Sequence, residues 1–193
     1  MFKHETQVIK FLLQWYSVNA RNLPWRKKNT LNLPDPYFVF VSEYMLQQTT
    51  VNTVKNKFND FILKWPSLNK LAQTSEPNIL KFWSGLGYYS RARNLLKSAK
   101  IIKKNFKNNI PKTYDELIQL PGIGDYTAKA ILGIGYNKSV MPLDANIERI
   151  LVRLHAIDKP INKVKNKLKD LGKKFISDKY SSCLLYTSDA ADE

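Results

Sequence analysis

A short proline–glycine turn holds the first residues whose types and spacing suit a chemical task. The stretch LPGIGDYTAKA, residues 120–130, joins two helical patterns and contains two of the chain's 7 glycines, Gly122 and Gly124. Glycine adopts the positive φ of a tight turn and lets backbone N–H groups approach a ligand closely. Because the helix that follows presents unpaired N–H groups, the turn favours phosphate binding. The alternative is an ordinary connection between two helices.

Two acidic residues lie in settings that could support chemistry. Glu43 stands within the apolar stretch FVFVSEYML, where burial would disfavour the carboxylate and raise its pKa. The alternative for Glu43 is an acid on the solvent-facing side of a helix. Asp144 opens the helical pattern ANIERILVRL, and the residues alone favour the structural role of an N-cap there.

Helices must position these residues, because apolar residues recur at three- and four-residue spacing almost throughout the chain. No convincing run alternates with period two, and three prolines mark residues 21–37 as a loop. The pattern predicts an all-α protein of about ten short helices. They are expected around Val8–Tyr16, near 38–48, 51–64, 68–73, 77–83, 88–105 and 113–119, from the glycine turn to about 136, and near 144–156 and 161–176.

Composition narrows the class of partner. The 193 residues include 31 Lys and Arg against 16 Asp and Glu, a net charge of +15. Such an excess indicates a polyanion, with nucleic acid first, although a lysine-rich composition bias is the alternative. One cysteine excludes a disulfide framework and a cysteine-built metal site within this chain. No apolar run approaches a membrane span, so we expect a cytoplasmic protein with no membrane partner.

Several ordered motifs resemble a known family. LPGIGDYTAKAILGI, followed by PLDANIERILVR, resembles the core of the helix–hairpin–helix/Gly-Pro-Asp superfamily of base-excision DNA glycosylases, to which endonuclease III belongs. PWR at 24–26, DPYFVFVSEYMLQQTTV at 35–51 and WSGLGYYSRARNL at 83–95 are similar to its adenine DNA glycosylase (MutY) family, and the likeness spans residues 5–175. The resemblance implies a six-helix barrel over 29–140, with the hairpin at 120–126. It also implies a second helical lobe, formed by 1–28 and 141–182.

The resemblance also assigns chemistry to the candidate residues. Hydrolysis of an N-glycosidic bond needs a proton for the leaving base and a negative charge near the oxocarbenium ion. By this resemblance, protonated Glu43 gives its proton to N7 of adenine and ionised Asp144 stabilises the cation. Tyr126 stands where endonuclease III has a lysine that forms a Schiff base, which implies a monofunctional enzyme. Lys129, one helical turn further on, should face elsewhere.

The family likeness implies contacts to double-stranded DNA with A:8-oxoguanine or A:G mispairs. The target base must be flipped out of the duplex, and Gln47 and Gln48 would wedge into the space it leaves. Tyr88 resembles the family's stacking residue, with core packing as the alternative. Arg26 would contact the extruded adenine and Arg91 a phosphate. We expect a monomer that acts at the nucleoid.

The sequence departs from the family in four ways. Tyr44 replaces a smaller aliphatic residue, Ala145 replaces a glycine, and KKNTLNLP lengthens the loop before Asp35. The family's four clustered cysteines, which hold a [4Fe–4S] cluster, and its domain that reads 8-oxoguanine are both missing. The cluster is therefore expected in full-length members but not on this chain, and an apolar face of the N-terminal helix should be exposed.

The last residues, CLLYTSDAADE at 183–193, resemble a translated sequencing adapter, so the native sequence is expected to stop near Ser182. Three functions remain in competition. The first is adenine excision, which we expect of the parent protein and only weakly, or not at all, of this chain. The second is a helix–hairpin–helix module that binds DNA without catalysis. The third, a lyase of the endonuclease III type, is disfavoured by Tyr126.

Overall fold

The computed structural model describes residues 3–26 and 33–175. Within these ranges the chain forms helices and no β-strand, so the all-α prediction is confirmed. The elements are α1 (Lys3–Asn19), the 3-10 turn η1 (Pro24–Arg26), α2 (Pro36–Leu46), α3 (Val51–Lys64), α4 (Leu68–Ala72), α5 (Glu76–Trp83), α6 (Ser90–Asn105), α7 (Tyr114–Ile118), α8 (Asp125–Ala130), the π-helical turn η2 (Ile131–Gly135), α9 (Ala145–Leu154) and α10 (Ile161–Lys173). The predicted tail at 183–193 and most of the lengthened loop lie outside the described residues.

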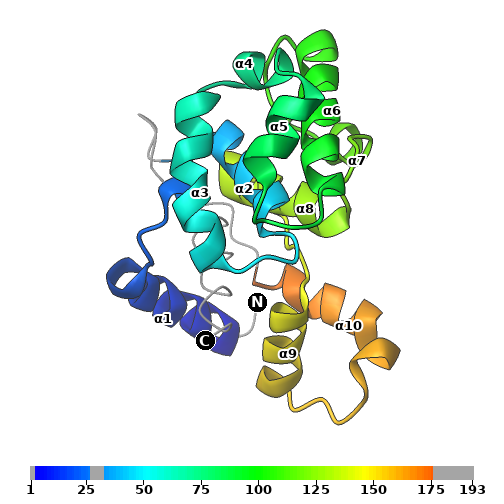
Figure 1. Cartoon of the computed structure of the whole chain (residues 1–193). Coiled ribbons are helices and arrows are strands. Elements are labelled where there is room, and N and C mark those ends of the chain that lie inside the picture. Colours follow the sequence, from blue (N-terminus) through cyan, green and yellow to red (C-terminus); the bar gives the residue numbers. More distant parts are fainter. Residues whose placement is uncertain (1–2, 27–32, 176–193) are drawn as a thin grey trace.

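Helix α2 is the central element of the larger part of the molecule (Figure 1). Asp35 starts it, because the Asp35 side chain accepts a hydrogen bond from the N–H of Tyr37 at 2.8 Å and Pro36 fits the first helical position. The helix then contacts η1, α3, α6 and η2. Eight of its eleven residues are buried, as expected of a helix surrounded by protein on every side.

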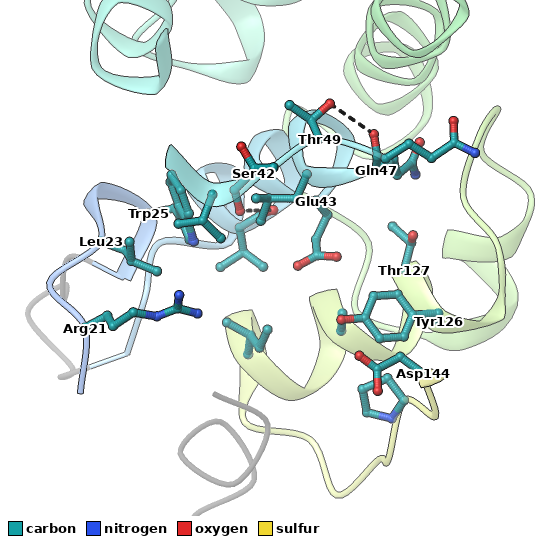
Figure 2. A pocket seen from close by; sticks show the side chains of 18 of the residues that line it. Arg21, Leu23, Trp25, Ser42, Glu43, Gln47, Thr49, Tyr126, Thr127 and Asp144 are labelled. Atoms are coloured by element: carbon teal, nitrogen blue, oxygen red, sulfur yellow. Dashed lines mark hydrogen bonds between the residues drawn. The ribbon is translucent and has the colours of Figure 1, made fainter. Parts of the chain in front are cut away.

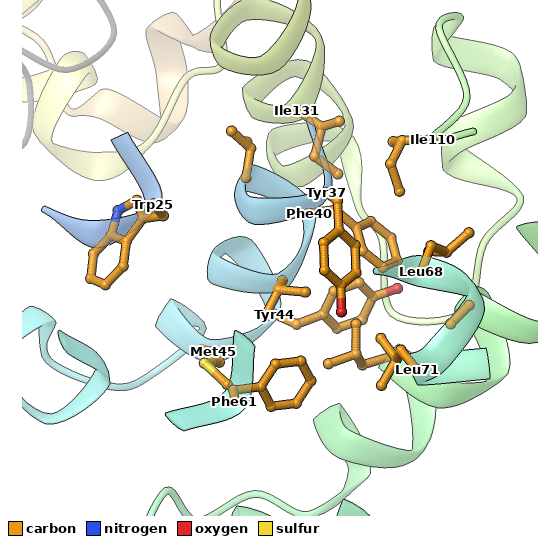
Figure 3. Packing of buried hydrophobic residues seen from close by; sticks show 14 of the residues in the cluster. Trp25, Tyr37, Phe40, Tyr44, Met45, Phe61, Leu68, Leu71, Ile110 and Ile131 are labelled. Atoms are coloured by element: carbon orange, nitrogen blue, oxygen red, sulfur yellow. The ribbon is translucent and has the colours of Figure 1, made fainter. Parts of the chain in front are cut away.

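The main hydrophobic core gathers around α2. Phe40, Tyr44 and Met45 are each fully buried, and Ile131 of η2 and Phe61 of α3 close on them (Figure 3). This cluster runs from Leu23 to Ile134, so it draws on residues within 29–140 and on the loop before them. Helix α2 therefore cannot shift without disturbing most of the core.

A second, smaller core lies at the end of the molecule where α1, α9 and α10 meet (Figure 1). It is built from Ile9, Ile147, Leu151, Val164, Leu168 and Phe175. The outer face of α1 keeps apolar side chains in solvent, because Phe11 and Trp15 are 60% and 45% exposed. The exposed apolar face expected on the N-terminal helix is therefore present. None of the described helices is long and apolar enough to cross a membrane.

A single arginine joins α2 to the turn that precedes α6. The Arg91 guanidinium donates to the carbonyls of Met45 at 2.7 Å and Leu86 at 2.7 Å. It also bonds the carbonyls of Tyr44, Gln47 and Gly87. The side chain is only 5% exposed, and this burial lowers the pKa of Arg91. Arg91 thus satisfies carbonyls at the end of α2 that the helix itself leaves unpaired.

Replacing Arg91 by Met should lower the free energy of unfolding by at least about 3 kcal/mol, because several buried carbonyls lose their only charged donor. Urea unfolding followed by circular dichroism measures the change. Arg93→Met is the matched control, since Arg93 makes an exposed ion pair with Glu76 at 2.9 Å. The control should change stability by less than about 1 kcal/mol. Equal losses of stability in the two variants would contradict the role of Arg91 in joining α2 to the turn before α6.

Candidate active site

A cavity of about 690 Å³ lies between α2, η1, α8 and the start of α9. Its lining is formed by Arg21, Leu23, Trp25, Val39, Ser42, Glu43, Leu46, Gln47, Gln48, Thr49, Thr50, Val51, Asn52, Tyr126, Thr127, Ala130, Ile134, Pro142, Asp144 and Ile147. The volume falls within the range of small-molecule sites. The three residues predicted to be catalytic, which are far apart in sequence, all line this one cavity.

Glu43 reaches into the cavity from α2 (Figure 2). Its neighbours Ser42 and Tyr44 are buried, and Glu43 itself is only 9% exposed. The apolar setting predicted for this acid is therefore confirmed, and the alternative of a solvent-facing acid is wrong. Val39, one helical turn earlier on the same face, contributes an apolar patch of the lining beside the carboxylate.

Asp144 and Tyr126 lie on the side of the cavity that Glu43 faces (Figure 2). Asp144 is the N-cap of α9, and its Oδ1 accepts a hydrogen bond from the N–H of Ile147 at 2.7 Å. The N-cap role that the residues alone favoured is thus confirmed. Because a carboxylate has a second oxygen, capping and a position on the cavity wall are compatible. Tyr126, on the first turn of α8, is 39% exposed.

The loop before α2 contributes a different arginine from the predicted one. Arg21 and Trp25 line the cavity, whereas Arg26 is not among its lining residues. Figure 2 shows the Arg21 guanidinium pointing into the cavity from the wall opposite Asp144. Arg21 was not predicted, because the loop has no periodicity that would indicate which way its side chains point. The only indication in the sequence was that two arginines, Arg21 and Arg26, flank NLPW.

The two glycines of the hairpin at 120–124 differ in backbone conformation and in the space around them. Gly122 has φ +79°, and a Cβ there would lie 2.8 Å from the side-chain amide nitrogen of Asn94. Gly124 is extended, with φ −97°, and a Cβ would meet nothing within 4 Å. Gly124 is also the N-cap of α8, and, having no side chain, it makes no side-chain capping bond to that helix. Only Gly122 therefore needs to be glycine for conformational reasons.

The two glutamines after α2 have different surroundings. The side-chain amide of Gln47 donates to the carbonyl of Gly122 at 3.1 Å, which joins it to the hairpin. Gln48 is exposed at the cavity rim and has φ +55°, a left-handed backbone that costs energy for a residue with a side chain. Both residues line the cavity, but in this structure Gln47 also braces the hairpin.

Tyr88 lies outside the cavity, in the turn between α5 and α6. It is 61% exposed and has φ +44°, so the alternative of core packing is wrong. Its ring centre lies 5.7 Å from the guanidinium carbon of Arg91, a cation–π distance. Arg91 itself differs from the prediction of a phosphate contact. It is buried beneath the turn, because protein carbonyls take its donors.

Lys129 forms an ion pair with Asp125 at 2.8 Å and is not among the residues that line the cavity. Asp125 also accepts a hydrogen bond from the hydroxyl of Tyr114 at 3.0 Å. The Lys129 and Tyr114 hydrogen bonds keep the pKa of Asp125 below its usual value despite the opposing effect of its burial. The lysine nearest to Tyr126 in sequence is thus held on the outer surface of α8, as predicted.

The residues of this chain do not fit an iron–sulfur cluster. Such a cluster is held by four cysteine thiolates, and the sequence has one cysteine, Cys183, which lies outside the described residues. Among the residues that the structure describes, no three His, Cys, Asp or Glu side chains are grouped so that they could hold a metal ion.

Comparison with known proteins gives one family and close relatives within it. Residues 41–174 match the family described as HhH-GPD superfamily base excision DNA repair protein. The chain is 46% identical over 149 residues to the adenine DNA glycosylase of Buchnera aphidicola subsp. Schizaphis graminum, covering 77% of this chain and 42% of that protein. It is 40% identical over 164 residues to the adenine DNA glycosylase of Homo sapiens, covering 81% and 30%. The chain therefore spans less than half the length of these relatives.

Solved structures share the fold at lower identity. A thermostable thymine-DNA glycosylase superposes with a TM-score of 0.83 at 21% identity, covering 97% of this chain and 85% of that one. A trapped endonuclease III–DNA covalent intermediate gives 0.74 at 18% identity, with the same coverage of both chains. The predicted helix–hairpin–helix glycosylase fold is thus confirmed.

The hairpin geometry predicts opposite results for its two glycines. Gly122→Ala should lower the free energy of unfolding by about 1–3 kcal/mol, because its positive φ is strained for alanine and Asn94 must move. Gly124→Ala should stay within about 0.5 kcal/mol of the parent chain, because its backbone is extended and its surroundings are open. Thermal unfolding of both variants measures the difference. Similar losses at the two positions would contradict this account of the turn.

Proposed function

The chain belongs to the HhH-GPD superfamily of base excision DNA repair proteins, and on that premise we propose that it carries the catalytic part of a monofunctional adenine DNA glycosylase. Its substrate would be duplex DNA with adenine opposite guanine or 8-oxoguanine. The observation that carries the proposal is the shared cavity, which Glu43, Tyr126 and Asp144 line together with Arg21 and Trp25. Identity of 46% to an adenine DNA glycosylase supports adenine as the base.

The cavity residues suit hydrolysis of an N-glycosidic bond. Buried Glu43, protonated, would donate its proton to N7 of the flipped adenine as the bond from C1′ to N9 breaks and its electron pair leaves with the base. Asp144, as a carboxylate, would stabilise the positive charge that develops on the sugar. Water then adds its hydroxyl to C1′ and returns a proton to Glu43. Trp25 and Arg21 offer an aromatic face and a charged donor to the base.

No lysine is among the described residues that line the cavity, which favours a monofunctional enzyme. Tyr126 has no amine and cannot form a Schiff base with the sugar, and Lys129 is paired with Asp125 at 2.8 Å on the outer surface of α8. The enzyme would therefore leave the DNA backbone intact after base release. Tyr126 would act through a hydrogen bond beside Glu43 and Asp144.

The elements around the cavity mouth would hold the duplex. Gln48 and Tyr88 are exposed and have positive φ, and such strained residues suit insertion into the base stack. Gly122, Gly124 and the open first turn of α8 would bind phosphate through backbone N–H groups. The net charge of +15 would strengthen every such contact. We expect a monomer that works in the cytoplasm, at the nucleoid.

A helix–hairpin–helix module that binds DNA without catalysis is the second candidate. It is favoured by one observation, that the glycine hairpin and the net charge of +15 would bind DNA whether or not the cavity is catalytic. The two candidates predict the same affinity for duplex DNA and differ in base release. To distinguish them, the unmutated chain is incubated in excess over a duplex with one A:G mispair, and alkali then cleaves the strand wherever adenine has been released. Strand cleavage supports the glycosylase, and an intact strand supports the binding module.

Glu43→Gln should reduce the single-turnover rate of adenine release by at least about 100-fold, because the variant has no acidic proton to give. The affinity for the mispaired duplex should stay within about threefold, since the amide keeps the shape of the acid. Glu116→Gln on α7 is the control, because Glu116 bonds Thr113 and does not line the cavity. An unchanged rate in Glu43→Gln would refute Glu43 as the acid.

Asp144→Asn separates the cap of α9 from the catalytic charge. Asn is as good an N-cap as Asp, so the free energy of unfolding should change by less than about 1 kcal/mol. Base release should fall by about 100-fold or more, because the amide carries no charge to stabilise the cation. Stability and single-turnover rate are measured on the same preparation. A rate that falls only in proportion to lost stability would assign Asp144 a structural role alone.

A further inference from the structure

Tyr44 makes a buried contact that the base-release chemistry does not use. Its side chain is fully buried on α2, directly after Glu43. The hydroxyl donates to the carbonyl of Pro121 at 2.5 Å and lies 2.9 Å from the hydroxyl oxygen of Ser98. Ser98, on α6, also donates to the Pro121 carbonyl at 3.1 Å. Two hydroxyl groups from two helices thus meet on one carbonyl of the hairpin.

A second bond from α2 reaches the next hairpin residue. Gln47, the C-cap residue of α2, follows Tyr44 by three positions, and its side-chain amide donates to the carbonyl of Gly122 at 3.1 Å. Helix α2 therefore holds two consecutive hairpin carbonyls. In a trans peptide the carbonyl and the next N–H point in opposite directions, so the bond to Pro121 turns the N–H of Gly122 away from α2.

We propose that Tyr44 is a positioning residue whose hydroxyl fixes the phosphate-binding hairpin at a set distance from Glu43. The inference rests on the proposed function, in which the hairpin holds DNA backbone and Glu43 faces the extruded base. Residues 43 and 44 are consecutive on one rigid helical turn, so the first faces the cavity while the second holds the hairpin. The DNA backbone and the base would therefore be held by one element, which sets their spacing.

The chemistry of the contact agrees with a permanent bond. Burial raises the pKa of the Tyr44 phenol well above its usual range, so the hydroxyl keeps its proton and remains a donor to Pro121.

The chain offers a matched control on the same helix. Tyr37 is also buried, and its hydroxyl donates to a backbone carbonyl, that of Trp65, at 2.7 Å. That bond joins α2 to the end of α3 and does not touch the hairpin. Tyr44→Phe and Tyr37→Phe therefore each remove one buried phenol–carbonyl bond, and a general loss of stability should affect both alike.

The first experiment measures binding of the full chain to a short duplex with one A:G mispair by fluorescence anisotropy. Tyr44→Phe should raise Kd by roughly 3- to 10-fold, as expected for one lost buried hydrogen bond, while Tyr37→Phe stays within about twofold. Where the unmutated chain releases adenine, the single-turnover rate at subsaturating protein should fall by a similar factor in Tyr44→Phe and stay within about twofold in Tyr37→Phe. Equal Kd values for the two variants would overturn the proposal.

A second measurement keeps the inference separate from the proposed function. Amide hydrogen exchange of DNA-free protein reports on the N–H of Ile123, which bonds the carbonyl of Leu120 at 3.1 Å within the hairpin. Tyr44→Phe should speed this exchange by about 10-fold relative to Tyr37→Phe, because the turn loses the Tyr44 bond to the Pro121 carbonyl. Unchanged exchange would overturn the positioning role. A parent chain that binds no duplex while the exchange result holds would instead reject the proposed function.

Discussion

The fold depends on one buried positive charge. Arg91 is 5% exposed, and its guanidinium lies between the end of α2 and the turn 86–87, where it bonds carbonyls from both. The charge is tolerable in the interior because several carbonyl oxygens and the rings of Trp83 and Tyr88 surround it. Lys57 of α3 donates to the carbonyls of Phe82 and Ser84 at the end of α5, just before this turn. The turn that presents Tyr88 is therefore held against the helix that carries Glu43.

Because Arg91 fixes the C-terminal end of α2, different side chains of this helix can take different roles. Glu43 reaches into the cavity, Tyr44 and the C-cap residue Gln47 bond the hairpin, and most other side chains pack in the main core. The groups that donate the proton, hold the DNA backbone and enter the base stack would thus be positioned by one rigid element. This reduces the entropy lost when they are brought together.

Much of the site was predictable because local sequence determined its parts. Apolar neighbours on both sides of Glu43 indicated its burial, and Asp144 before a helical pattern indicated an N-cap. Both features are present. The family likeness suggested a phosphate contact for Arg91, whereas the structure buries this side chain among backbone carbonyls that nothing in the local sequence revealed. Arg21 was missed for a related reason, because a loop without periodicity does not indicate which way its side chains point.

The sequence by itself determined the helices, their order and the turns between them, because periodicity, prolines and capping residues act within a few positions along the chain. It also determined membership in the glycosylase superfamily, through motifs kept in order. Only the tertiary structure decided that Glu43, Tyr126 and Asp144 share one cavity, that Gln47 braces the hairpin, and that Tyr44 bonds Pro121. Those contacts join residues far apart in the chain, and their geometry arises from how the helices pack around α2.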